Sequence, residues 1–288
     1  MLKEQIRHIV ESNPEYAAIT PVIEKEILHH DIIDVMVKQG AMQSLVFIGG
    51  TSLRMCYNAS RLSEDLDFNG GHDFKPAHFD GLEVEIQKYI QNKYETEVWV
   101  NKPIEDVQGN TSSWKISIVK EANRPDLPRQ KMHIDVCAIP SFDVEKRPLL
   151  NHYNIVVPTE GLLIPVQSLQ ETLADKLIAL AYRARRIKPR DIWDIVWIKQ
   201  RGINLSLELI DRKLAARGKQ MRISAIAIAC FGIIRSLLFL TYSFTLTDRN
   251  PLFFSLIHPL IRSDGCCEPI DPVTHPLPLD FRSCCTIH

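Results

Sequence analysis

The stretch LVFIGGTSLRMCYNASRLSEDLDF, from Leu45 to Phe68, decides the fold expected of this chain. Its opening apolar run, LVFI, is short and contains β-branched residues, and it predicts a buried strand. Gly49 and Gly50 break this strand, and Thr51 is expected to cap a helix over residues 52–58. Free backbone N–H groups at such a helix start, next to glycines that allow close approach, predict a phosphate-binding turn.

The same stretch ends in Asp65-Leu66-Asp67-Phe68, where carboxylates alternate with apolar residues. Residues two apart on a strand point to the same face, so Asp65 and Asp67 are expected side by side, with Leu66 and Phe68 in the core. Two adjacent carboxylates repel each other unless a cation lies between them, and a divalent metal is the simplest explanation. A phosphate-binding turn followed by metal-binding carboxylates predicts nucleotidyl or phosphoryl transfer.

Two arginines between the turn and the carboxylates are candidate phosphate ligands. The order strand, Gly-Gly-Thr, helix, Asp-x-Asp resembles the first motif of the DNA polymerase β-like nucleotidyltransferase superfamily. The fuller form, GGTSLRMCYNASRLSEDLDF, resembles more narrowly the AbiEii/AbiGii abortive-infection toxins, the toxins of type IV toxin–antitoxin pairs. This resemblance implies a set of nucleotide-binding residues: Gly49, Gly50, Thr51, Arg54, Arg61 and Ser63.

Two later segments match further motifs of that family. The run Met132–Val136 alternates as a strand does, and the resemblance makes Asp135 a third metal ligand or the base for an attacking hydroxyl. ETLADKLIAL matches the motif whose lysine, Lys176 here, meets the phosphates of the nucleotide. Just before it, Ser168 and Glu171 predict a capping box, which would give Glu171 a structural role.

A fourth motif matches at Arg190, Asp191 and Asp194. The two aspartates are three residues apart on a predicted helix and share a face. The resemblance implies that they orient Lys176 and Arg190 or touch the nucleotide. A basic cluster precedes this helix and has two readings, a solvated helix end or a phosphate or RNA surface. Its members are Arg183, Arg185, Arg186, Lys188 and Arg190.

The expected architecture is α/β (α+β), with a polymerase β-like lobe built on a mixed sheet and followed by a helical lobe. Periodicity predicts helices over residues 2–12, 21–38 and 76–93, and strands over 97–100, 114–119, 132–136 and 155–157. His29 and His30 adjoin on the second helix and point in different directions, which favours packed or solvated histidines over a metal chelate. The chain is expected to turn helical at Pro165, which gives three parts: 1–160, 161–222 and 223–288.

The composition changes after Arg222, where lysine disappears and five of the seven cysteines occur. The run Ile223–Leu240 is apolar but holds Arg235 near its middle. A membrane span needs about 20 apolar residues, and a central arginine costs roughly 2.5–3.5 kcal/mol, so a buried helix is favoured. The adjacent cysteine pairs lack the CxxC separation typical of zinc sites.

The chain of 288 residues has a formal charge of −1, so nothing in its overall charge indicates nucleic-acid binding and any such surface must be local. Seven cysteines and an N-terminus without an apolar signal core favour a cytoplasmic protein with no membrane partner. The resemblance implies transfer of a nucleoside monophosphate from an NTP at a two-metal Mg²⁺ site held by Asp65, Asp67 and Asp135. It also implies an RNA acceptor such as tRNA and a cognate antitoxin.

Two alternatives remain open from the sequence. A small-molecule nucleotidyltransferase of the antibiotic-modifying type would share the metal site but would need no basic RNA surface. A nucleotide-binding protein without catalysis would act through partner contacts and would release no pyrophosphate.

Overall fold

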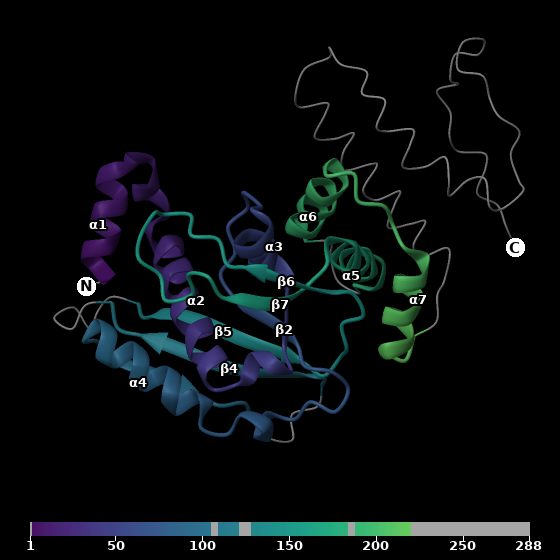
Figure 1. Cartoon of the computed structure of the whole chain (residues 1–288), viewed down its shortest axis with the longest axis horizontal. Helices are drawn as coiled ribbons and strands as arrows, with labels where there is room; N and C mark the ends of the chain where they lie inside the picture. Colours follow the sequence, from purple (N-terminus) through teal and green to yellow (C-terminus); the bar gives the residue numbers. More distant parts are fainter. Residues whose placement is uncertain (1, 105–108, 121–127, 184–187, 220–288) are drawn as a thin grey trace, which may run out of the picture. The chain divides into compact units, whose positions relative to one another are not determined.

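The computed structural model describes residues 2–104, 109–120, 128–183 and 188–219. Within these ranges the strands form one mixed sheet in the order β3-β4-β5-β2-β1-β7-β6 (Figure 1). Strand β2 runs parallel to β5, and β1 parallel to β7, while the other neighbours are antiparallel. The strands are β1 (Val46–Ile48), β2 (Leu66–Asn69), β3 (Val98–Asn101), β4 (Thr111–Ile118), β5 (Gln130–Cys137), β6 (Val144–Pro148) and β7 (Leu163–Gln167).

In Figure 1 the helices of residues 2–38 and 82–94 lie on one side and those of residues 169–216 on the other, with the helix of residues 49–57 between them. Short 3₁₀ turns at Pro14–Ile19, Ala41–Gln43 and Pro76–Phe79 connect some of the elements. The α-helices are α1 (Leu2–Ser12), α2 (Thr20–Lys38), α3 (Gly49–Tyr57), α4 (Leu82–Tyr94), α5 (Leu169–Tyr182), α6 (Pro189–Gln200) and α7 (Leu207–Ala216). The α/β class expected from the sequence is therefore confirmed.

One face of the sheet is apolar and buried. Phe47 of β1 and Phe68 of β2 are fully buried and stack with ring centroids 5.1 Å apart. Trp114 of β4 shares this face, and Ile86 and Ile90 of α4 are buried without exposed surface. Each Å² of apolar surface removed from water contributes about 25 cal/mol to the free energy of folding. The buried side chains on this face are therefore the main source of the sheet's stability. The alternate residues of the same strands point to the opposite face.

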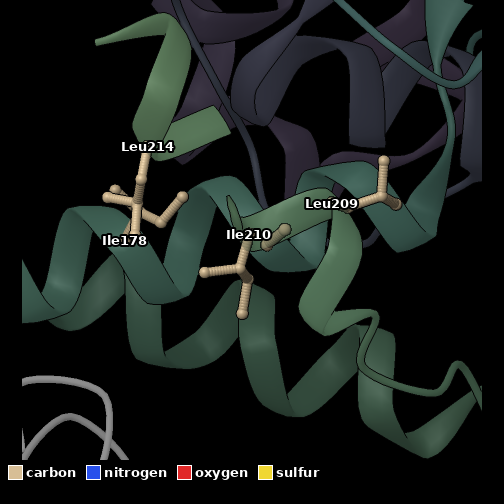
Figure 2. Packing of buried hydrophobic residues seen from close by; sticks show 5 residues of the cluster. Ile178, Leu209, Ile210 and Leu214 are labelled. Atoms are coloured by element: carbon tan, nitrogen blue, oxygen red, sulfur yellow. The ribbon is translucent and has the colours of Figure 1, made fainter. Parts of the chain in front are cut away.

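Helices α5 and α7 form a second apolar cluster, on which Phe142, Tyr182 and Leu205 pack. Figure 2 shows Leu214 of α7 lying against Ile178 of α5, with Ile210 about one turn before Leu214 and Leu209 next to Ile210 in the chain. The cluster fixes α7 against α5, the helix that follows β7 directly.

The expected end of the sheet is wrong. No strand forms at residues 155–157, and Val156 is 86% exposed. The sheet instead ends with β6 and β7, two strands that the sequence pattern did not predict. Strand β7 pairs in parallel with β1, so the sheet extends to Gln167 and crosses the expected boundary at 160/161. Pro165, the expected start of the helical part, lies in β7 opposite Lys146. The helical part begins with Ser168 as N-cap of α5.

The helix expected over 76–93 is interrupted. A 3₁₀ turn ends at Phe79, and Gly81, with φ +89°, separates it from α4. His29 and His30 of α2 are buried and packed, as expected. The apolar run Ile223–Leu240 and the cysteine pairs of the tail lie outside the described residues. Among the residues that the structure describes, no helix is long and apolar enough to cross a membrane.

Candidate active site

Three carboxylates gather where β2 and β5 run side by side. The parallel register places Asp67 directly opposite Asp135. Asp65 immediately precedes β2, and its Oδ1 lies 3.3 Å from His133 Nδ1 on β5. Ser113 on β4, opposite Asp135 in the register, donates its hydroxyl to Asp135 Oδ1 at 2.5 Å. The Asp-x-Asp pair and the later strand aspartate are thus brought together by two neighbouring strands.

These carboxylates repel one another. Burial and the negative charges of Asp135 and Asp65 together raise the pKa of Asp67 to about 6, against the opposing effect of Lys176 and Arg190. Within the described residues, no three metal-binding side chains already converge on one point. The donor set nevertheless fits a divalent cation, because carboxylate oxygens are the ligands that Mg²⁺ prefers and the raised pKa reflects burial together with the negative charge of two neighbouring carboxylates.

The double glycine allows close approach to this site. Gly49 has a φ of +82°, and a Cβ there would collide with Asp67 Oδ2. A Cβ on Gly50 would collide with the Arg61 guanidinium and would lie 2.9 Å from Ser63 Oγ. Gly49 and Gly50 therefore bring the first turn of α3 against Asp67, Arg61 and Ser63 at once, a packing that no larger residue permits.

Thr51 is not the helix cap expected from the sequence. The helix begins at Gly49 with Ile48 as N-cap, so Thr51 lies inside α3. Its side chain is fully buried, and its hydroxyl donates to the backbone carbonyl of Asp65. Thr51 therefore ties α3 to the residue that enters β2 and fixes the position of Asp65.

Arg54 is engaged away from the carboxylates. Its Nε lies 2.9 Å from Oε1 of the buried Glu26 on α2, and its Nη1 donates to the Ala59 carbonyl at 3.3 Å. Tyr153 donates its hydroxyl to the same Glu26 carboxylate. These contacts give Arg54 a sufficient structural role, and we do not retain it among the proposed nucleotide ligands.

Asp194 of α6 collects two cations at the edge of the site. Lys176 Nζ lies 2.7 Å from Asp194 Oδ2. Arg61 donates two hydrogen bonds to the same carboxylate, from Nε at 2.8 Å and from Nη2 at 3.0 Å. This bidentate pair aims the guanidinium of Arg61 between α6 and Gly50. Asp194 has a side-chain exposure of 1%, so the pair is well shielded from water.

Asp191, one turn earlier on α6, holds Lys176 at 3.3 Å and also accepts from Arg183. Burial alone would raise the pKa of Asp191, but Lys176 and Arg183 outweigh it and the pKa is lowered. The aspartates therefore orient Lys176, as expected, together with Arg61 and Arg183. Arg190 is exposed, and its charge reaches Asp67.

The capping box is only half present. Ser168 Oγ accepts from the Glu171 N–H at 3.1 Å, but the Glu171 carboxylate does not reach back to Ser168. It accepts instead from the N–H groups of Phe142 and Asp143, at 2.9 and 2.6 Å, and pairs with Lys213 at 2.5 Å. Lys213 is 42 residues from Glu171 in the sequence, so local spacing did not reveal this ion pair.

Sequence reasoning missed Ser113, His133 and Trp193 as neighbours of the site. Trp193 of α6 lies under the Arg61 guanidinium at 5.9 Å and stacks on Trp197 at 6.2 Å between centroids. The four-residue spacing of the two tryptophans was the available signal for that stack. No comparable signal identified Ser113, because its partner is set by the register of β4 on β5.

The comparisons decide the family. The profile described as nucleotidyl transferase AbiEii toxin, type IV TA system, matches residues 32–254, which is most of the chain. The chain belongs to the AbiEii family. As an AbiEii protein it is a nucleotidyltransferase toxin of a type IV toxin–antitoxin system. No curated protein sequence matches it.

Two solved structures are similar to this chain. MenT4, a nucleotidyltransferase toxin from Mycobacterium tuberculosis H37Rv, is similar with a TM-score of 0.51 at 18% identity, over 75% of this AbiEii chain and 74% of its own. At this identity the likeness to MenT4 concerns the fold alone. JHP933 from Helicobacter pylori is similar with a TM-score of 0.43 at 16% identity, over 77% and 95% of the two chains.

Proposed function

We propose that this AbiEii protein transfers a nucleoside monophosphate from an NTP to an RNA acceptor in a Mg²⁺-dependent reaction. An acceptor hydroxyl forms a bond to the α-phosphorus while the bond to the β-phosphate oxygen breaks, and pyrophosphate leaves. The observation that carries the proposal is the register that sets Asp67 opposite Asp135, against the Gly49–Gly50 turn.

Asp65, Asp67 and Asp135 would hold the metal. His133 orients Asp65 and Ser113 orients Asp135 through hydrogen bonds. When bound, Mg²⁺ supplies charge stabilisation to the phosphates and to the attacking and leaving oxygens. Thr51 keeps Asp65 in place through its backbone carbonyl. The acidic cluster thus belongs to the proposed metal-binding half of the site.

The cationic half would bind the triphosphate. Lys176 and Arg61 are presented by Asp194, while the exposed Arg190 is close enough to influence Asp67. The backbone of Gly49 and Gly50, with Ser63 beside it, adds hydrogen-bond donors at the start of α3. Fixed cations that need no rearrangement stabilise the charge that develops on the phosphates during transfer.

Membership in a type IV toxin–antitoxin family supports a cognate antitoxin as partner. The RNA acceptor is the further part of the proposal. The proposed substrate of the protein, an NTP, is an intracellular metabolite. The proposal therefore retains the cytoplasmic location expected from the sequence. Which RNA is modified is left to the experiment, in which total RNA serves as the acceptor.

The test incubates the full chain with each labelled NTP, Mg²⁺ and total RNA, and follows label in RNA and pyrophosphate release. We expect label in RNA with at least one NTP, and none with the Asp135→Asn variant. Label in a low-molecular-weight product instead would favour a small-molecule nucleotidyltransferase. NTP binding without pyrophosphate release under any condition would favour a non-catalytic nucleotide-binding protein.

A further inference from the structure

The carboxylates stand on the face of the sheet opposite its apolar core, and this face continues across β5, β4 and β3. The register defines two rows beyond the first row of Asp67, Asp135 and Ser113. The second row runs from His133 to Lys115 and Asn101. The third row runs from Lys131 to Ser117 and Trp99.

The charge of this face is basic away from the carboxylates. Lys115 and Lys131 are exposed, and Arg129, which immediately precedes β5, is exposed beside them. Within the three strands, Asp135 is the only acidic residue, and Glu97 precedes β3 at the far edge. We call Trp99, Lys115, Arg129 and Lys131 the basic strip. It begins one row from the proposed metal site.

Trp99 gives the basic strip an aromatic surface. Its ring is partly exposed and lies 4.0 Å from the Arg129 guanidinium carbon, which confirms that both side chains are on the same face. Neighbouring strands are about 4.8 Å apart and residues rise about 3.3 Å along a strand. Lys131 is four residues from Asp135 and therefore about 13 Å from it along β5. A few nucleotides of single-stranded RNA span such a distance.

We propose that the basic strip binds a single-stranded segment of the RNA acceptor next to the hydroxyl that reacts. Lys115, Lys131 and Arg129 contact backbone phosphates, and an unpaired base stacks on Trp99. This inference rests on the proposed function, since it supplies the acceptor to the same carboxylates. Lysine, arginine and an exposed aromatic ring are the combination that binds single strands without base-specific contacts.

The experiment measures RNA binding without NTP, so that it is separate from chemistry. The probe is a fluorescein-labelled single-stranded 20-mer RNA, read by anisotropy on the full chain. The test variant is Lys115→Glu/Lys131→Glu, and its charge-matched control is Lys75→Glu/Lys88→Glu, whose lysines are exposed at the start of the Pro76–Phe79 turn and on α4. NTP affinity and label transfer are measured on all of them.

We expect the strip variant to weaken RNA binding at least tenfold and to raise KM for RNA, with NTP affinity unchanged. Loss of two phosphate contacts should also reduce the slope of log K against log salt by roughly 1.4. Trp99→Ala should weaken binding about five- to a hundredfold, and Trp99→Phe should retain most of it, because stacking needs only an aromatic face. The control double variant should bind as the unmodified chain does.

Three results would overturn the inference. One is equal RNA binding and KM in the strip and control variants. Another is no binding of the 20-mer by the unmodified chain. The third is loss of antitoxin binding in the strip variant while its RNA binding is retained, because the strip would then be a protein interface. If RNA binding depends on the strip but no NTP transfers label, the proposed function fails and the strip stands.

Discussion

Two clusters of charge in this protein differ in how their charges are compensated. In the first, Asp65, Asp67 and Asp135 are close enough to repel one another, and burial together with this repulsion raises the pKa of Asp67 to about 6. In the second, between α5 and α7, the fully buried Glu171 and Lys213 pair at 2.5 Å. Lys176 and Arg190 compensate the first cluster only in part, whereas the second contains its own counter-charges.

The second cluster is closed by two more residues. Asp175 accepts from Lys213 and from Arg217, each at 2.8 Å. Glu171 also accepts the N–H groups of Phe142 and Asp143, which leads the chain from β5 toward β6. Every charge there has a partner of opposite sign, so no ligand is required. Repelling carboxylates in the first cluster store a free-energy cost that a bound cation removes, and this difference separates a site from a scaffold.

The largest effect is expected from Asp67→Asn. Transfer should fall about a thousandfold or more, because one of the three proposed metal ligands is lost from the site. Stability in the absence of metal should rise. The folded pKa of about 6 lies above the ordinary 3.8, so ionisation of Asp67 opposes folding as the pH rises from 4 to 6. Removing that charge gains at most about 3 kcal/mol at pH 8.

Urea unfolding at pH 4 and pH 8 without metal checks this prediction, alongside the label-transfer assay. The stability gain should be mostly lost near pH 4, where Asp67 is protonated in the folded state and close to half protonated in the unfolded state. A variant that is inactive and destabilised at pH 8 would show that Asp67 is a structural residue, and the contrast between the two clusters would be lost.

Lys213→Met tests the compensated cluster. It leaves Glu171 buried opposite no cation, and breaking a buried pair in this way typically costs about 3–5 kcal/mol. We expect a large fall in the free energy of unfolding, measured in urea, with NTP affinity unchanged in the fraction that remains folded. The matched variant Glu208→Gln breaks an exposed pair with Arg212 and should change stability by less than about 1 kcal/mol. Equal effects of the two variants would remove the proposed importance of burial.

Lys176→Met falls between the two clusters, because Lys176 is paired yet close to Asp67. NTP affinity should weaken about ten- to a hundredfold, as expected for loss of a charge-assisted bond to phosphate. Stability should change by less than for Lys213→Met, since Asp194 keeps Arg61 and Asp191 keeps Arg183. Paired thermal melts and NTP titrations measure both. Normal NTP affinity in this variant would assign Lys176 to the scaffold.

The sequence predicted the parts of the site whose residues are close together in the chain. The turn at Gly49–Gly50, the Asp65/Asp67 pair and the helix of Asp191 and Asp194 all depend on local spacing. The partners that cross the fold did not follow from spacing. Arg61 lies 133 residues from Asp194, and Arg54 is held by Glu26 on a different helix. Local motifs indicate which charged residues are present. Strand register and helix packing determine which of these residues form ion pairs with one another.

The same limit explains the errors in the sheet. Strands β6 and β7 did not follow from the sequence pattern. Pro165 lies inside β7, and β6 alternates exposed with half-buried residues and contains no fully buried one. Strand β7 is nonetheless the parallel neighbour of β1, which leads into the Gly49 turn. A proline in a strand removes one donor but leaves the packing of Ile164 and Val166, both buried.

The smallest expected effect is the pH dependence of Mg²⁺ binding to the unmodified protein. Mg²⁺ binds ionised carboxylates, so a proton on Asp67 competes with it. With the pKa of Asp67 raised to about 6, the carboxyl is ionised at pH 8 and mostly protonated at pH 5. The apparent affinity should therefore be nearly constant from pH 8 to pH 7 and should weaken about tenfold between pH 7 and pH 5. Isothermal titration calorimetry at several pH values measures the affinity and the released protons together.

Circular dichroism at pH 5 serves as the control for unfolding, and Lys213→Met provides the contrast. That variant alters the compensated cluster only, so its folded fraction should keep the same pH profile for Mg²⁺ with the midpoint near pH 6. An ordinary aspartate would place the fall in affinity below pH 4, because its carboxyl stays ionised above that value. A midpoint there would mean that the three carboxylates are well solvated and do not repel one another strongly, and the inferred cation site would lose its electrostatic basis.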